Sequence, residues 1–122
     1  MAFYESIIII RQDVSSADVD KIANDIKTVI TDLGGKIIKT EYWGLRSLAY
    51  EIQNNKKGHY YFMGIEADKP TLDEMNRKIK LSESIIRSSL IRVNEISKDV
   101  SPILRAKSSE DENVVDVTST RD

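Results

Sequence analysis

The chain is poor in the residues that build reactive or metal-binding sites. Its 122 residues include no cysteine, a single histidine, five glycines and two prolines. Without cysteine there is neither a disulfide framework nor a cysteine-ligated metal. No Walker loop, dinucleotide-binding glycine fingerprint or nucleophile elbow is present. We therefore expect no catalytic residues, no metal site and no cofactor, and we expect the protein not to be an enzyme.

Long apolar runs are absent as well. The longest run, Ile7–Ile10, is far shorter than the roughly 20 residues of a membrane-spanning helix. The first residues do not follow the basic, apolar, small-residue order of a signal peptide. A chain of this size buries about two thirds of the surface that it exposes when unfolded, which allows one core. These features predict a soluble, cytoplasmic protein with one folded domain.

A strong excess of one charge is also missing, but the charges are unevenly distributed. The chain has 18 Lys and Arg against 20 Asp and Glu, a net charge of −2. Residues 1–107 have a net charge of +2, whereas residues 108–122 have a net charge of −4. After Pro102 there are too few apolar residues to offset the entropy cost of ordering the chain. We predict a folded domain over residues 1–97 and a flexible, largely acidic tail over residues 98–122.

Periodic patterns predict four strands and two helices. Residues 13–33 place apolar side chains at a helical period of 3.6, and Ser15 or Ser16 can cap this helix. Thr71 and Glu74 fit a capping box that begins the second helix. Runs of β-branched and aromatic residues favour strands. The predicted elements are strands at 3–12, 36–53 (interrupted at Gly44), 59–67 and 85–93, a hairpin loop at 54–58, and helices at 13–33 and 71–81.

The order strand, helix, strand, strand, helix, strand limits the topology. Two right-handed crossovers joined by one hairpin give a four-stranded antiparallel sheet in the order 4-1-3-2, with both helices on one face. We therefore predict an α+β protein with a ferredoxin-like β-α-β-β-α-β sandwich. Helices cover one face of this sheet, and the other face is open to a partner.

Basic side chains gather in two stretches. Five of them and one acid lie between Arg77 and Arg92, and the long hairpin carries five more. Such groups beside aromatic strands suit RNA, because phosphate contacts supply much of the affinity and base stacking adds to it. An ordinary solvated surface explains the same charges, so both interpretations stay open. We expect Tyr60, Tyr61, Phe62 and Met63 to pack in the core and sheet, with at most one ring exposed to a partner. We expect His59 to be exposed or adjacent to RNA.

The most specific pattern surrounds the interruption at Gly44. Residues 42–52, Tyr-Trp-Gly-Leu-Arg-Ser-Leu-Ala-Tyr-Glu-Ile, resemble the tryptophan-glycine, arginine, leucine-alanine-tyrosine signature of the bacterial small-subunit ribosomal protein S6 family. Other segments are similar to that family in order and spacing, and the resemblance covers about residues 2–107. These segments are Phe3–Glu5, Lys57–Tyr60, Ile86–Ser88 with Arg92, and Ser101–Lys107.

This resemblance implies a structural role in the small ribosomal subunit, in the cytoplasm. Proteins of this family bind the central domain of small-subunit ribosomal RNA together with a small basic partner, ribosomal protein S18, and they are not enzymes. The implied mechanism is a rigid sheet that presents one surface to S18 and a basic edge to RNA, so that the two binding events are coupled. No membrane and no small-molecule substrate are expected.

Arg46 is the first candidate contact, because it lies in the signature and a guanidinium can bind a phosphate with two parallel hydrogen bonds. The alternative is a salt bridge to Glu41 or Glu51. Two positions depart from the family pattern: Glu51 stands where many members have proline, and Ser47 stands where a second long polar side chain is common. We therefore expect weaker direct RNA contact along this strand.

The fourth strand offers two more arginines. Alternation predicts that Arg87 shares one face with Ile85 and that Arg92 shares the other face with Ile86, and one arginine could instead pair with Glu5. Two lysines at the hairpin tip and two amphipathic aromatic residues complete the set. The candidate RNA-binding or partner-interface residues are Arg46, Lys56, Lys57, Arg87, Arg92, Trp43 and Tyr50.

Two other functions fit the same fold. A dimeric ligand sensor would use the open sheet and would be stabilised by a metabolite, but it leaves the signature and the basic stretch unexplained. A single-strand RNA binder of the recognition-motif type would stack bases on Tyr60 and Phe62. Such domains also carry an aromatic residue in the first strand, where this chain has Ile7–Ile10.

Overall fold

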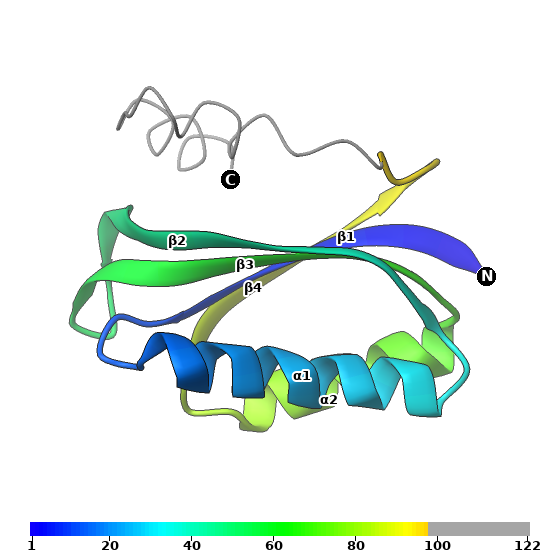
Figure 1. Ribbon diagram of the computed structural model, residues 1–122, viewed down its shortest axis with the longest axis horizontal. Helices are drawn as coiled ribbons and strands as arrows, with labels where there is room; N and C mark the ends of the chain where they lie inside the picture. The colour runs from blue at the N-terminus through cyan, green and yellow to red at the C-terminus, as the bar shows by residue number, and fades with distance from the viewer. Residues whose placement is uncertain (98–122) are drawn as a thin grey trace.

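The computed structural model describes residues 1–97, and the predicted acidic tail at 98–122 lies outside them. The elements follow the predicted order (Figure 1). The strands are β1 (Ala2–Arg11), β2 (Lys36–Ile52), β3 (Asn55–Ala67) and β4 (Ile85–Val93), and the helices are α1 (Ser16–Asp32) and α2 (Lys69–Leu81).

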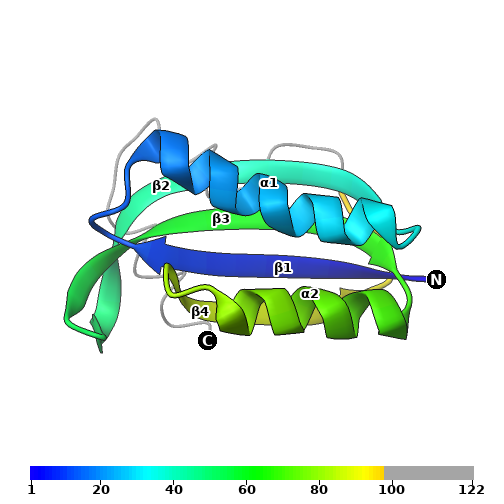
Figure 2. The same ribbon diagram turned by 90° about the horizontal axis from the view of Figure 1, so that it is seen from below.

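The four strands form one antiparallel sheet in the order β2-β3-β1-β4. This is the predicted order 4-1-3-2 read from the opposite edge, so the ferredoxin-like fold is confirmed. Both helices lie on the same face of the sheet (Figure 1 and Figure 2). We refer to this face as the covered face and to the opposite one, on which residues 1–97 place no helix, as the open face.

A core of mainly aliphatic side chains fills the space between the sheet and the helices. Alternation along β1 directs Ile8 and Ile10 into this core, and β3 adds Met63 and Ile65. None of these four side chains is exposed, and burying apolar surface contributes about 25 cal/mol per Å². The helices close the core with one apolar stripe each, from Val19, Ala23, Ile26 and Ile30 of α1 and from Leu72, Met75 and Ile79 of α2.

The ends of α1 agree with the sequence pattern. Ser15 is the N-cap residue, and its hydroxyl accepts a hydrogen bond from the Asp18 N–H at 3.2 Å. Gly34, just after the helix, has a φ of +93°, a conformation that is costly for residues with a Cβ atom. The local pattern therefore identified the N-cap residue and the terminating glycine, although the helix begins at Ser16, three residues after the predicted start.

The start of α2 differs from the prediction. The cap is Asp68 instead of Thr71, and the Asp68 carboxylate accepts hydrogen bonds from the Thr71 hydroxyl at 2.7 Å and the Thr71 N–H at 3.2 Å. The predicted capping box was wrong because Pro70 lies inside the first turn, where its missing N–H costs no helical hydrogen bond. The two hydrogen bonds lower the pKa of Asp68, with the larger effect from the Thr71 hydroxyl.

The turn between β2 and β3 is shorter than the predicted loop at 54–58. Only Gln53 and Asn54 lie between the strands, with φ values of +49° and +67°, as in a two-residue hairpin turn of the primed type. Asn55 stabilises the turn from the start of β3, because its side-chain amide donates to the Ile52 and Gln53 carbonyl oxygens at 3.2 and 3.0 Å. Residues that looked like loop therefore extend the hairpin.

A bulge at the start of β4 corrects the predicted alternation. Arg87 lies opposite Ile9, but Ile85 lies opposite Ile10, so Ile86 is an extra residue in the strand. Ile85 joins the covered core, whereas Ile86 packs on the open face beside Ile9. The predicted pairing of Arg87 with Ile85 on one face was wrong, because strict alternation does not hold across a bulge.

Candidate RNA and partner interface

The open face carries a second apolar cluster, although no described helix covers it. Its buried members come from all four strands and include three aromatic rings. Trp43 stacks on Phe62 with ring centroids 5.4 Å apart and an angle of 9° between the ring planes. The buried residues of this cluster are Ile9, Trp43, Tyr60, Phe62 and Ile86.

Gly44 explains how β2 places Trp43 on this face. Tyr42 lies opposite Tyr61 and Gly44 lies opposite Tyr60, so Trp43 is the extra residue of a bulge. Gly44 has a φ of +96°, which a residue with a Cβ atom adopts only at a cost. The interruption at Gly44 in the sequence is therefore a bulge, and it directs Trp43 toward Phe62.

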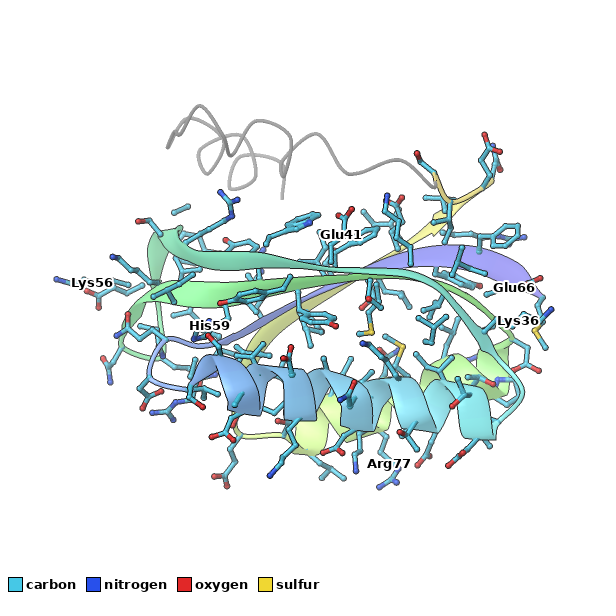
Figure 3. All side chains as sticks on the ribbon, in the orientation of Figure 1. Lys36, Glu41, Lys56, His59, Glu66 and Arg77 are labelled. Atoms are coloured by element: carbon cyan, nitrogen blue, oxygen red, sulfur yellow. The ribbon has the colours of Figure 1, made fainter. Side chains whose placement is uncertain are left out.

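Polar groups of β2 accompany the stacked rings. The Trp43 indole N–H donates to the Glu41 carboxylate at 2.9 Å, and Glu41 forms an ion pair with Lys39 at 3.6 Å. The Lys39 ammonium lies 5.7 Å from the centroid of the Phe62 ring. Figure 3 shows Glu41 on the side of the sheet opposite the helices. The open face is thus an ordered mixture of aromatic and charged groups.

The residues after β4 turn onto the open face. Ile96 is buried against Gly64, where a Cβ atom would lie 2.7 Å from the Ile96 Cγ2 atom. The Lys39 ammonium donates to the Ser97 carbonyl oxygen at 2.9 Å. The absence of a side chain at position 64 therefore lets the end of the described chain lie on the sheet.

Four basic candidates, Arg46, Lys56, Lys57 and Arg87, lie at the opposite end of the sheet, near the β2–β3 turn. The Arg46 guanidinium is mostly buried, and its Nε donates to the Trp43 carbonyl oxygen at 2.8 Å. Burial lowers the pKa of Arg46 below its ordinary value. Within residues 1–97 no carboxylate pairs with Arg46, so the alternative interpretation, a salt bridge to Glu41 or Glu51, is not supported.

Arg87 meets Tyr50 across the sheet, although their strands are its two edges. The pairing of β2 with β3 is irregular between Ser47 and Ile52, and Figure 2 shows the hairpin end bent toward β4. An Arg87 terminal nitrogen donates to the Tyr50 hydroxyl at 2.9 Å, and the guanidinium carbon lies 6.0 Å from the ring centroid. The bend of β2 brings together two residues that were predicted separately.

The lysines of the hairpin tip are exposed, as predicted. Lys56 points away from the end of the sheet in Figure 3. The tip is attached to β1, because the Gln12 N–H donates to the Asn55 side-chain oxygen and the Lys57 N–H donates to the Gln12 side-chain oxygen, both at 3.1 Å. Lys56 and Lys57 therefore extend from an anchored turn.

Arg92 does not join these residues. It lies opposite Tyr4, whose side chain packs against the covered core, so Arg92 is on the covered side of an edge strand. Arg87 and Arg92 thus lie on opposite faces, as predicted. Glu5 pairs with neither arginine in the described part of the chain.

His59 is buried, which contradicts the prediction that it is exposed or adjacent to RNA. It lies opposite Ile10 and therefore faces the helices, as Figure 3 shows. Its Nδ1 atom lies 2.8 Å from the Tyr42 hydroxyl. The prediction failed because the two-residue turn places His59 well inside β3 instead of at its start.

Sequence reasoning missed the residues that connect the candidate side chains. Asn55 and Gln12 hold the hairpin tip, and Leu48 and Ile52 line a hollow beneath Tyr50. The turn-forming character of Asn55 was visible in the sequence, but its hydrogen bonds to distant segments were not. No three His, Asp or Glu side chains in residues 1–97 lie close enough to hold a metal ion, and none of the described helices is long and apolar enough to span a membrane.

A comparison with protein families matches most of the described chain. The model of the family described as ribosomal protein S6 matches residues 3–92. This range includes both helices and all four strands, except for Ala2 at the start of β1 and Val93 at the end of β4.

Curated relatives extend the similarity to nearly the whole chain. The small ribosomal subunit protein bS6 of Rickettsia prowazekii is 56% identical over 118 residues, which cover 97% of this chain and 98% of that protein. The protein of the same name from Rickettsia rickettsii is 55% identical over the same shares of both chains.

Solved structures agree on the fold. The crystal structure of 30S ribosomal protein S6 from Thermotoga maritima superposes with a TM-score of 0.72 at 30% sequence identity, covering 75% of this chain and 87% of that one. The C-terminal domain of the MgtC protein from Mycobacterium tuberculosis has a TM-score of 0.54 at 7% identity, covering 81% of this chain and 95% of that chain. That second likeness shows only a shared fold.

Proposed function

The chain belongs to the ribosomal protein S6 family, and from this premise we propose that it binds the central domain of small-subunit ribosomal RNA cooperatively with ribosomal protein S18. As a member of the family it is a structural component of the small ribosomal subunit, in the bacterial cytoplasm, and its role is structural rather than catalytic.

The grouping of Arg46, Arg87, Lys56 and Lys57 at the hairpin end of the sheet is the observation that carries the proposal. Within residues 1–97 the Arg46 guanidinium has no ion-pair partner, and Lys56 and Lys57 are exposed. Basic groups bound to phosphates release counterions, so affinity falls as salt rises. Four such contacts to a single strand predict a slope of about −3 in a plot of log K against log salt concentration.

The rest of the open face suits a protein partner. Trp43, Phe62 and Ile86 form a buried apolar patch beside the Lys39–Glu41 ion pair, and interfaces commonly combine aromatic anchors with polar neighbours. A body with little net charge gains from a basic partner that supplies further phosphate contacts. We therefore assign the aromatic part of the open face to S18 and the hairpin end to RNA.

Retention of a central-domain RNA fragment on filters, at two salt concentrations with and without S18, tests this function. Coupling between the two partners should tighten RNA binding by about 5- to 150-fold, and the tight binding should weaken as salt rises. No retention under either condition contradicts the proposal, and so does an affinity that S18 leaves unchanged.

Substitution of single basic residues then tests the assignment of RNA to the hairpin end. Arg87→Ala and Lys56→Ala should each weaken RNA binding and reduce the salt slope by about 1. Lys80→Ala is the matched control, since it removes an exposed positive charge from α2 on the covered side. Equal losses in all three variants would show that the effect is general charge and not this site.

A further inference from the structure

A pocket of about 190 Å³ lies on the open face beneath Tyr50. Ile9 of β1 and Tyr60 of β3 lie on its sheet side, and Leu48 and Ile52 come from the bent end of β2. Arg87 lines it from β4. The pocket exists because the pairing of β2 with β3 is interrupted between Ser47 and Ile52.

The pocket wall is apolar and aromatic, with one cation. Its aliphatic side chains and the ring of Tyr60 offer van der Waals contacts to a flat ligand. Tyr50 is 62% exposed at the rim. The Arg87 guanidinium bonds to the Tyr50 hydroxyl and lies near its ring. Single-stranded RNA is bound by the same combination, in which bases stack on aromatic and guanidinium planes beside groups that hold phosphate.

Charge favours a nucleotide over an apolar side chain of a protein as the occupant. None of the residues lining the pocket is acidic. Arg46 and the two lysines of the hairpin tip lie at the same end of the sheet, because Arg46 is opposite Gly58, the residue after Lys57. A phosphate attached to a bound base would therefore meet a positive surface on leaving the pocket.

The volume of the pocket limits the size of the group that it can bind. Sites for drug-sized molecules usually measure about 300–1,000 Å³, so this pocket has room for one ring system but not for a complete nucleotide. The sugar and phosphate would stay at the rim, where Tyr50 and Arg87 lie. We propose that the pocket takes the base of one unpaired nucleotide of the bound RNA, with its phosphate against Arg87; this inference rests on the RNA-binding function proposed above.

Two variants test the pocket with the full chain, S18 and the central-domain RNA fragment. Tyr50→Ala removes the rim, and Ala49→Phe fills the pocket while leaving the rim in place. Tyr42→Ala is the matched control, because this tyrosine is also on β2 and partly exposed but lies opposite Tyr61 of the covered core. Thermal unfolding first confirms that each variant is folded.

The expected result is a loss of RNA affinity of roughly 10-fold or more for both pocket variants at saturating S18, the value of one stacked base. Affinity for S18 without RNA, measured by calorimetry, should stay unchanged. A loss of S18 affinity instead would show that a protein side chain occupies the pocket, and wild-type RNA affinity in both variants would show that the pocket is unused. Either outcome overturns the nucleotide proposal but leaves the RNA-binding function intact, whereas failure of the wild-type protein to bind the fragment overturns both.

The RNA offers an independent check. Replacing unpaired nucleotides of the fragment one at a time by abasic residues should identify a position that weakens wild-type binding by a similar factor. This loss should not add to that of Tyr50→Ala, because the two changes remove the same contact. Additive losses at every position would contradict the proposal.

Discussion

Both faces of the sheet bury side chains, but with different chemistry. Phe62 and Met63 are neighbours in β3, and they point to the open and the covered face with 5% and 0% of their surfaces exposed. Met63 lies among aliphatic side chains under two helices. Phe62 stacks on Trp43 and has the Lys39 ammonium 5.7 Å from its ring centroid, with no helix of the described chain above it.

This difference shows that a buried cluster can have a role besides stability. An aliphatic core offers a partner nothing to recognise once the helices cover it. Aromatic rings combined with a partly buried ion pair keep polar groups at a surface that a second molecule can contact. The open face can therefore stabilise the domain and also present the surface that we propose for S18, and the following substitutions separate these two roles.

Phe62→Ala should have the largest effect on stability. Truncation of a buried phenylalanine typically costs about 3–5 kcal/mol, and here it also removes the stacking partner of Trp43. The free energy of unfolding, measured by urea denaturation, checks the value, with Leu45→Ala as an exposed apolar control. A loss below about 1 kcal/mol would show that the open face is a surface and not a second core.

Met63→Ala should cost nearly as much, about 2–5 kcal/mol, because Met63 is fully enclosed by the covered core. Unlike Phe62→Ala, it should leave the S18 affinity of the folded protein unchanged. Calorimetric titration with S18 at a temperature where both variants remain folded makes the comparison. Equal loss of S18 affinity in both variants would contradict the division between the faces.

Gly44→Ala should have a smaller effect, about 1–2 kcal/mol, the cost of a left-handed backbone in a residue with a Cβ atom. Because Trp43 is the only tryptophan, its fluorescence should change if the bulge at Gly44 holds it against Phe62. Gly34→Ala is the matched control, since Gly34 has a similar φ of +93° and an added Cβ atom would meet nothing within 4 Å. It should reduce stability without altering the fluorescence, and identical spectra for both variants would contradict the role assigned to Gly44.

Asp68→Asn should give the smallest effect. It should appear only as a pH dependence of the free energy of unfolding, because Asp68 caps one of the helices that cover the sheet. The hydrogen bonds from Thr71 lower the pKa of Asp68 in the folded protein, so the carboxylate stabilises the fold fully above its unfolded pKa of about 3.9. This contribution is lost as the pH falls through the lower pKa of the folded state. The stability difference between wild type and Asp68→Asn, from urea unfolding at pH 6 down to pH 2, should therefore shrink, and a constant difference would contradict this assignment.

Local patterns predicted the elements well and their exceptions poorly. Ser15 and Gly34 delimit α1 through interactions within one turn, which the sequence alone reveals. The bulge at Ile86 reverses the predicted faces of two isoleucines, and a bulge depends on pairing with β1. The same reasoning applies to His59, whose environment changed once the turn proved to be two residues long.

The candidate site was predicted as residues but not as an arrangement. Arg46, Lys56, Lys57 and Arg87 lie at the same end of the sheet, with Tyr50 beside Arg87. Arg92 resembles them in type and strand, but the register places it opposite Tyr4 on the other face. Residue chemistry selects candidates, whereas register decides which of them meet.

The order of the elements, the stripes of the helices and the family of the chain were readable before folding, because periodicity, capping residues and short signatures act over a few positions. Tertiary structure alone decided that Tyr50 meets Arg87 and that Trp43 stacks on Phe62. It also decided that a pocket opens between Tyr50, Arg87 and Ile9 of β1. These contacts join segments from different strands, and their geometry depends on bulges and on the bend of β2. Such features arise from cross-strand packing, so no local stretch of sequence specifies them.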